Sequence, residues 1–175
     1  IPQVVVINNS SPTTTLPDGT PPNTIHVTVG EIPTYVTDEE IARIILNTKG
    51  LGCPTFGSTS VSVEDSQGHL HEIKFSKAVP KSVYLNVEIL FLDEEYAGAE
   101  EAILADLVTH INNLTAGEDV IWSRLFGIIT PYAKAQVNIL ETSPDGVTYN
   151  PTNLVVGDSE YATTVEGNIS IVVAN

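Results

Sequence analysis

The stretch from Val83 to Phe91 carries an apolar side chain at every second position, and a helical pattern follows it directly. Alternation with a period of two is typical of a β-strand with one buried face. In the next segment, Ala99 to Asn113, apolar residues recur at helical spacing. They are Ile103, Leu104, Leu107, Val108 and Ile111. Because both apolar stripes must be covered, we expect this helix to pack on the sheet that contains Val83 to Phe91.

The rest of the second half adds another helix and further strands. A helical pattern with inward-facing residues ends before Pro131, which cannot continue a helix. These residues are Ile121, Leu125, Ile128 and Ile129. Strand patterns begin at Ala135 and Ile169, with turn residues at Asp145-Gly146 between them. Residues 80–175 therefore predict an α+β unit of order β-α-α-β-β-β, with helices on a mostly antiparallel sheet.

Residues 24–79 predict a smaller unit of order β-α-β-β. Ile25 to Val29 alternates as a strand does. Thr37 and Glu40 have the spacing of a capping box, in which each side chain satisfies a backbone N–H of the first helical turn. The helix that follows has Ile41, Ile44 and Ile45 on one face and is expected to end near Gly50. Two alternating strands around a turn at Asp65 to Gly68 predict a hairpin.

The first 23 residues have a different composition. An apolar run, Val4 to Ile7, precedes a segment rich in Ser, Thr, Pro and Gly. That composition is typical of an extended linker or arm, so we expect the apolar run to belong to, or pair with, an upstream element. The chain starts at Ile1 and contains no methionine, so we also expect a region before Ile1. The predicted organisation is an arm (1–23), a first α+β unit (24–79) and a second (80–175).

The charge of the chain limits its partners. The 22 acidic and 7 basic residues of the 175 give a formal net charge of −15. Such a surface repels phosphate backbones, which argues against nucleic-acid binding, and it disfavours anionic membranes. No apolar run approaches the roughly 20 residues that a membrane-spanning helix needs.

Two groups of residues invite a metal interpretation. His69 and His71 lie two apart on a predicted strand, so they face the same side, and Glu64 or Glu72 would have to supply a third ligand. The same spacing is typical of ordinary hairpin histidines. A second group is acidic and precedes the helix that starts near Ala99. Its members are Asp93, Glu94, Glu95, Glu100 and Glu101. Carboxylates can bind a hard cation, but they also stabilise a helix N-terminus, and we predict no metal site.

The sequence offers little for covalent catalysis. It lacks a G-x-S-x-G elbow, a phosphate-binding loop, a dinucleotide motif and a CxxC pair, and His110 falls within an ordinary amphipathic helix. Cys53 is the single cysteine, and we expect a small, partly buried thiol there. We therefore predict no enzyme activity, no catalytic residue and no cofactor. Trp122 and Arg124 are candidate interface residues, because these two residue types often anchor protein contacts.

Three stretches resemble one family in order and spacing. The first is LPDGTPPNTIHVTVG, Leu16 to Gly30, which is similar to a D-G-x-P-P segment leading into a strand. The second, Asp38 to Ala78, resembles an I-A-x-x-I helix, a G-x-T-x-V strand, a D-x-x-G turn and an I-x-F-S strand. The third is LTAGEDVIWSRLFGIIT, Leu114 to Thr130, which is similar to a G-E-x-V-x-x-S-R-L helix. Together they resemble the baseplate J-like proteins, wedge proteins of contractile phage tails such as those of Mu-like phages.

The resemblance implies a virion structural protein of the tail baseplate, assembled in the bacterial host cytoplasm. Its expected partners are other wedge and hub proteins and copies of itself, with no nucleic acid and no membrane. Phage, prophage, tailocin and other contractile injection systems all fit this expectation. Two other functions stay open: a small-ligand or carbohydrate-binding module of a surface or secreted protein, and a cation-dependent hydrolase that uses the acidic group.

Overall fold

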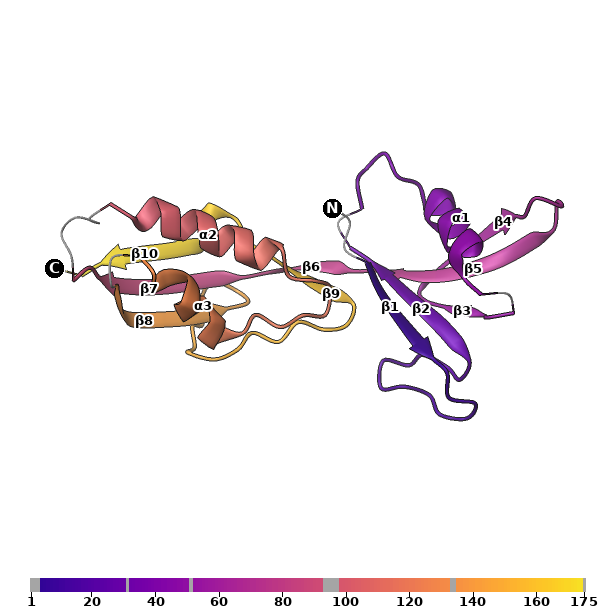
Figure 1. Cartoon of the computed structure of the whole chain (residues 1–175), viewed down its shortest axis with the longest axis horizontal. Coiled ribbons are helices and arrows are strands. Elements are labelled where there is room, and N and C mark those ends of the chain that lie inside the picture. The colour runs from indigo at the N-terminus through magenta and orange to yellow at the C-terminus, as the bar shows by residue number, and fades with distance from the viewer. Residues whose placement is uncertain (1–3, 31, 51, 93–97, 133–134, 175) are drawn as a thin grey trace. The chain divides into compact units, whose positions relative to one another are not determined.

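The computed structural model describes residues 4–30, 32–50, 52–92, 98–132 and 135–174, and the chain divides into two compact units, Ile1–Val79 and Pro80–Asn175 (Figure 1). Both units combine helices with sheets whose longer ladders are antiparallel. The predicted α+β class, with helices packed on mostly antiparallel sheets, is confirmed.

Unit 1 is built on a five-stranded sheet. Its strand order is β1 (Val4–Asn9), β2 (Thr24–Val29), β5 (Leu70–Lys77) and β4 (Thr59–Glu64), with the short β3 (Thr55–Phe56) beside β2. The β1–β2 and β4–β5 pairs are antiparallel, whereas β2 runs parallel to β5 and β3. The order leaves β1 at one edge of the sheet.

Helix α1 (Asp38–Thr48) supplies the other layer of unit 1. The capping box is present, because Thr37 Oγ1 accepts from the backbone of Glu40 and the Glu40 carboxylate accepts from the backbone of Thr37. The helix ends at Thr48, close to the expected end near Gly50, and its C-cap residue Lys49 is extended. The helix places Ile41, Ala42 and Ile45 in a core with five sheet residues. Those are Val27, Val29, Val63, Ile73 and Phe75.

The start of the chain differs from the expected arm. Val4–Asn9 forms β1 and pairs along its whole length with β2, from Val4 opposite Val29 to Asn9 opposite Thr24. The apolar run therefore pairs with a strand of unit 1, and residues 4–23 are part of that unit. The physical reason is that β2 carries Val27 and Val29 on the α1 side, and Val4 and Val6 of β1 extend the same apolar face.

Unit 2 has a three-stranded sheet with β7 (Tyr84–Leu90) in its centre. On one side β8 (Gln136–Ser143) is antiparallel, and on the other β10 (Ile169–Val173) is parallel. The remaining described elements are β6 (Val79–Ser82) paired with β9 (Glu160–Thr163), α2 (Glu100–Asn112), α3 (Trp122–Ile129) and a 3-10 turn at Glu166–Asn168.

The core of unit 2 joins the apolar stripe of Val83 to Phe91 with that of Ala99 to Asn113. Ile103, Leu107 and Ile111 of α2 are fully buried. They lie in one cluster with the inward residues of β7, which are Leu85, Val87 and Ile89, and with Val83 before it. The predicted packing of this helix on the sheet that contains this strand is confirmed.

A carboxylate holds the turn after β8. Asp145 Oδ1 accepts from the backbone N–H groups of Thr148 and Val147 at 2.9 and 2.8 Å and from the Ser143 hydroxyl at 2.8 Å. These hydrogen bonds, the one from Thr148 first, lower the pKa of Asp145 to about 2. A lowered pKa in the folded state means that the charged form stabilises the fold and that this contribution is lost as the pH falls.

We therefore expect Asp145→Asn to lower the free energy of unfolding at neutral pH. The difference from the unsubstituted chain should shrink as the pH falls from about 4 to about 2, because the carboxylate then takes up a proton in both folded and unfolded states. Urea denaturation of both chains across this pH range measures it. A difference that stays constant with pH would show that the charge of Asp145 does not stabilise the turn.

Candidate functional site: an apolar groove beside an edge strand

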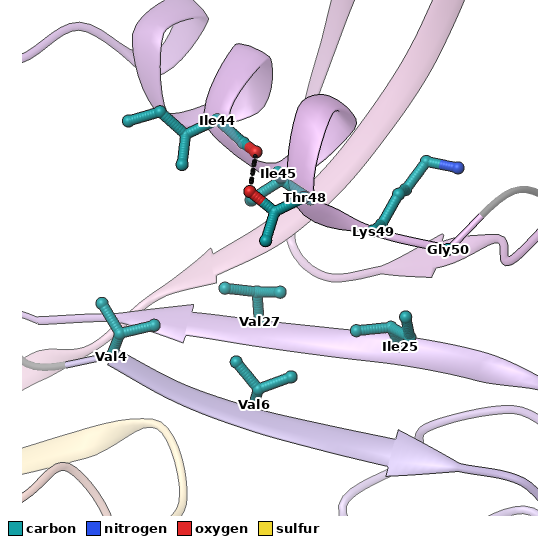
Figure 2. Close-up of a pocket in the computed structure, with 9 residues that line it drawn as sticks. All are labelled: Val4, Val6, Ile25, Val27, Ile44, Ile45, Thr48, Lys49 and Gly50. Carbon is teal, nitrogen blue, oxygen red and sulfur yellow. Dashed lines mark hydrogen bonds between the residues drawn. The ribbon is translucent and has the colours of Figure 1, made fainter.

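An open apolar groove lies between α1 and the β1–β2 pair (Figure 2). The contacts of α1 concentrate on β4 and β5, so the helix covers the same face of β1 and β2 only in part. The cavity volume is about 280 Å³. The lining residues are Val4, Val6, Ile25, Val27, Ile44, Ile45, Thr48, Lys49 and Gly50.

Three large aliphatic side chains around this groove face solvent. Val4 is 53% exposed, Val6 is 60% exposed and Ile44 is 65% exposed. Single exposed aliphatic residues are common, but a contiguous group around a hollow is typical of a surface that binds another molecule. The exposure of Ile44 also corrects the expectation that it faces inward with Ile41 and Ile45.

Strand β1 has none of the usual protection of a sheet edge. Natural edge strands are commonly protected by charged residues, prolines or bulges, which prevent pairing with other chains. β1 has the sequence VVVINN and pairs with β2 in continuous register. From Val4 to Pro17 the chain carries no charged residue, although its net charge is −15. The edge and the groove thus form one nearly uncharged surface, on which Lys49 is the charged lining residue.

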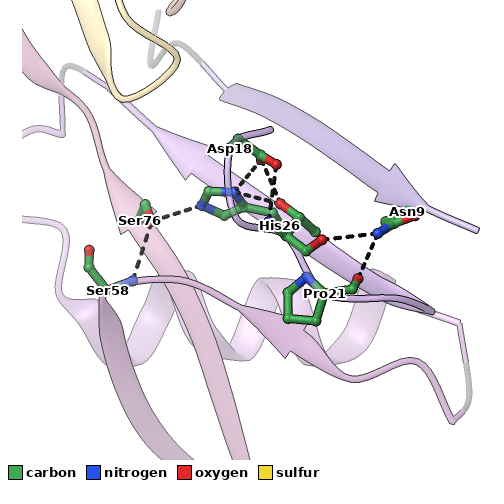
Figure 3. A network of polar contacts seen from close by, with 7 residues as sticks. Asn9, Asp18, Pro21, His26, Ser58 and Ser76 are labelled. Carbon is green, nitrogen blue, oxygen red and sulfur yellow. Dashed lines mark hydrogen bonds and ion pairs between the residues drawn. The ribbon is translucent and has the colours of Figure 1, made fainter. Parts of the chain in front are cut away.

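The opposite face of β2 is polar and closed. His26 Nδ1 lies 3.2 Å from Asp18 Oδ2, and its Nε2 lies 2.8 Å from Ser76 Oγ (Figure 3). A carboxylate only accepts hydrogen bonds, so Nδ1 is the donor. Burial raises the pKa of Asp18, but hydrogen bonds from Thr20 and His26 outweigh it and hold the pKa below its usual value.

Serine, histidine and aspartate in this order are the components of a hydrolytic triad, but the arrangement is enclosed. His26 is 5% exposed and Ser76 is 7% exposed, and the Ser76 hydroxyl also accepts from the backbone of Ser58 at 3.3 Å. The ring of Phe56 packs edge-on against the imidazole at 5.2 Å between centroids. A substrate carbonyl cannot reach a hydroxyl buried in this way. The network fastens β2, β5 and the loop before β2 to one another.

This network was not found from the sequence, although a signal for it exists. Thr24, His26 and Thr28 alternate with the apolar residues of β2, and all three are buried. A polar alternate face usually indicates solvent, but here the loop of residues 10–23 and the ring of Phe56 cover it. The prediction of an extended linker therefore missed that this loop is part of the fold.

Asn9 holds that loop against the sheet through its side-chain hydrogen bonds. It is 3% exposed, and its amide nitrogen reaches the carbonyl oxygens of Thr14, Thr20 and Pro21 at 2.8, 3.0 and 2.9 Å. We expect Asn9→Ala to cost about 1–3 kcal/mol, because it leaves buried carbonyls without a donor. Urea denaturation measures this, and Asn8→Ala is the matched control, since Asn8 is exposed on the same strand. Equal stability of the two variants would contradict the fastening role.

The two histidines that were weighed as metal ligands instead contact the aspartate of the hairpin turn. His71 Nε2 and His69 Nδ1 both approach Asp65 Oδ2, at 2.9 and 3.5 Å. The hydrogen bond from His71 is the largest cause that lowers the pKa of Asp65, followed by backbone donors of the same turn. Glu72 instead accepts from Ser60 at 2.8 Å. Within the described residues, no group of three His, Cys, Asp or Glu side chains is arranged to hold a metal ion.

The acidic group is only partly visible. Asp93, Glu94 and Glu95 lie outside the described residues, while Glu100 and Glu101 form the first turn of α2. Cys53 is a free, half-buried thiol.

Trp122 and Arg124 lie in the first turn of α3 but make separate contacts. Trp122 is half-buried, donates from Nε1 to the carbonyl of Leu140 at 2.6 Å and meets Phe126 edge-on at 4.7 Å between ring centroids. Arg124 is exposed and lies 3.4 Å from Glu118. The indole therefore fixes α3 to β8. It also lines a surface hollow together with Pro151. Their role as interface residues stays a prediction.

Comparison with known proteins identifies no family for this chain. No protein-family model matches the chain, and no curated protein matches its sequence. In the described part of the chain, every helix is too short or too polar to cross a membrane.

Proposed function

We propose that this chain is a non-catalytic assembly module of a contractile-tail baseplate wedge, of the baseplate J-like type, and that it works by binding other proteins. The observation that carries the proposal is the open apolar groove of unit 1 beside the uncharged edge strand β1. The Ser-His-Asp group, by contrast, is enclosed and serves packing.

In and next to the stretches that resemble the family, several residues have a clear structural role. Gly57, the first residue of the G-x-T-x-V stretch, passes so close to Phe75 that an added Cβ would lie 2.5 Å from its Cα. Asp18, in the D-G-x-P-P stretch, joins the network around His26. Thr37 caps the helix of the I-A-x-x-I stretch. Because these residues maintain the shape of unit 1, they support a family whose members share an architecture.

The charge of the chain suits a protein that acts within a large assembly. At a net charge of −15, electrostatic repulsion opposes contacts with free partners unless the contact uses an uncharged or basic surface. In a baseplate, many modest contacts act together because neighbours are held at high effective concentration. The proposed partners are wedge and hub proteins and copies of the chain, and the proposed location is the tail baseplate of a virion or related particle.

The genes next to this one test the proposal. Genes for a tail tube, a tail lysozyme or a tail fibre in the adjoining reading frames are the expected result. A neighbourhood of sugar-uptake or surface-protein genes would contradict it and favour the carbohydrate-binding alternative. A thermal-shift screen with sugars separates the two independently, since a ligand that binds the folded state raises the melting temperature.

A further inference from the structure

We infer that the outer face of the unit 2 sheet binds a basic partner protein, which places an arginine or lysine side chain between Glu88 and Glu141. The inference rests on the proposed function, in which the chain works by binding other proteins, and adds the chemistry of one partner surface. It follows from three observations. The face lies outside the core, its two carboxylates are held in place without a cation, and unit 2 carries most of the negative charge of the chain.

The core of unit 2 lies on one face of its sheet. Successive residues of a strand point to opposite faces. In β7, Leu85, Val87 and Ile89 are fully buried in one cluster with residues of α2 and α3. The alternate residues of β7 lie on the outer face and are half-buried. They are Tyr84, Asn86, Glu88 and Leu90. On the neighbouring strands, the outer face carries Ile139, which is 37% exposed, and Val172, which is 52% exposed.

Glu88 lies in the middle of this outer face. Its register partners are Ile139 on β8 and Val172 on β10, so it has an exposed aliphatic side chain on each side. Glu141 is its diagonal neighbour, two positions from Ile139 on the same strand. Diagonal neighbours are roughly 7–8 Å apart, within reach of long side chains. One basic side chain can therefore contact both carboxylates, while its aliphatic stem packs on Ile139 and Val172.

Neutral amides hold both carboxylates in place. Asn138 Nδ2 donates to Glu88 Oε1 at 3.1 Å, and Asn86 Nδ2 donates to Glu141 Oε2 at 3.0 Å. The ion pairs within the described residues all involve other carboxylates. A carboxylate can accept about four hydrogen bonds, so each keeps capacity for a cationic donor, which forms the stronger type of hydrogen bond. Because the amides orient both groups beforehand, binding orders little that is not already ordered.

The charge of unit 2 selects a basic protein as the partner. Residues 80–175 hold 14 of the 22 acidic residues of the chain and 3 of its 7 basic residues. Two of these basic residues lie in the described part of the chain, and each already contacts a carboxylate. The pairs are Lys81 with Glu160 and Arg124 with Glu118. A nucleic acid or an anionic membrane would bring phosphates against this face, whereas a basic protein surface complements its charge.

Titration of the purified chain with a synthetic peptide tests the inference. The peptide Val-Arg-Val-Arg-Val, with both ends blocked, presents its two arginines on one side when extended. Amide chemical shifts of the labelled chain give the dissociation constant and locate the contact. We expect the shifts to centre on Glu88 and Glu141, and the affinity to fall as salt screens the attraction. A peptide that does not bind, or that shifts signals across the whole acidic surface, would overturn the inference.

Paired glutamine substitutions separate this face from general attraction. Glu88→Gln combined with Glu141→Gln should weaken binding at least about tenfold, because it removes two charge-assisted contacts. Glu101→Gln combined with Glu166→Gln is the matched control, since it removes the same charge from exposed positions of unit 2. The control should change the affinity by less than about twofold, as expected for distant, screened charges. Equal weakening by the two pairs would overturn the inference.

A lysine placed on the face provides a second test that keeps both glutamates. Val172 pairs with Glu88, so Val172→Lys supplies a cation within the chain and should weaken peptide binding. Val155→Lys is its control, because Val155 is 66% exposed and the change in charge is the same, and it should leave binding nearly unchanged. Melting temperatures of all variants show that they fold. Undiminished binding by Val172→Lys would overturn the inference.

Calcium chloride distinguishes a basic protein from a metal ion as the partner. If calcium alone shifted the signals of Glu88 and Glu141 and displaced the peptide, the face would be a cation site and the inference would be overturned. Failure of the inference is also distinct from failure of the proposed function. A chain that does not bind the peptide but is present in tail baseplates would refute the basic partner alone. Specific binding by a chain absent from tails would refute the baseplate assignment and leave the basic partner in place.

Discussion

Leu107→Asp should unfold unit 2, at a cost of at least about 3 kcal/mol. Leu107 is fully buried on α2, in the middle of the stripe that runs from Ile103 to Ile111. The substitution removes an aliphatic side chain from the core and places a carboxylate there without a partner. Because that cluster includes the residues of β7, the loss should extend to the sheet.

Tryptophan fluorescence during urea denaturation measures this effect. Trp122 is the only tryptophan in the chain and lies in unit 2, so its emission reports on the unit that carries Leu107. Ile44→Asp is the control, because it makes a similar change on an exposed face of another helix and should alter stability by no more than about 0.5 kcal/mol. A loss for Leu107→Asp within the same limit would mean that α2 does not pack on the sheet.

Gly57→Ala should destabilise unit 1 by on the order of 3 kcal/mol. The added Cβ would lie 2.5 Å from Phe75 Cα and closer still to the carbonyl group of that residue. These are backbone atoms of β5, which cannot move aside without disturbing its pairing with β4. The φ of Gly57 is also +156°, a conformation that side chains rarely adopt.

Gly127→Ala provides the contrasting glycine. Gly127 lies within α3 and has open space where its Cβ would be, so alanine should raise stability by up to about 1 kcal/mol through helix propensity. Far-UV circular dichroism during denaturation follows both variants. Similar, small effects of the two substitutions would show that the strand after Gly57 does not approach Phe75 as closely as described.

The local elements could be predicted from the sequence where a single periodicity decides them. The stripes of Val83 to Phe91 and of Ala99 to Asn113 correspond to β7 and α2, because both faces that pack together lie close in the chain. The capping box at Thr37 marks the start of α1, since it depends on contacts only three residues apart.

Pairings between distant segments could not be predicted in the same way. β1 is followed by a polar, proline-rich stretch, and only the three-dimensional structure shows that Asn9 and Asp18 hold this stretch against the sheet. The parallel pairing of β10 with β7 joins strands about eighty residues apart, and no local pattern determines it.

The sequence did not reveal the groove, because the groove exists where α1 leaves part of the sheet uncovered. A groove is created where α1 ends its contact with the sheet, and a periodic pattern shows which residues are apolar but not which of them lack a neighbour. Ile44 falls on the same helical face as Ile41 and Ile45 by spacing, yet it lies at the margin of that face. Trp122 was selected by residue type, and its half-buried position reflects an indole N–H that bonds to Leu140.

Electron microscopy of particles from the organism that encodes this chain tests the central claim most directly. Contractile tails are purified after induction and labelled with a gold-conjugated antibody raised against the purified chain. The assembly role predicts gold at the baseplate end of the tails, with no labelling along the sheath. Tails that are never labelled, while the antibody detects the chain elsewhere in the same culture, would contradict it.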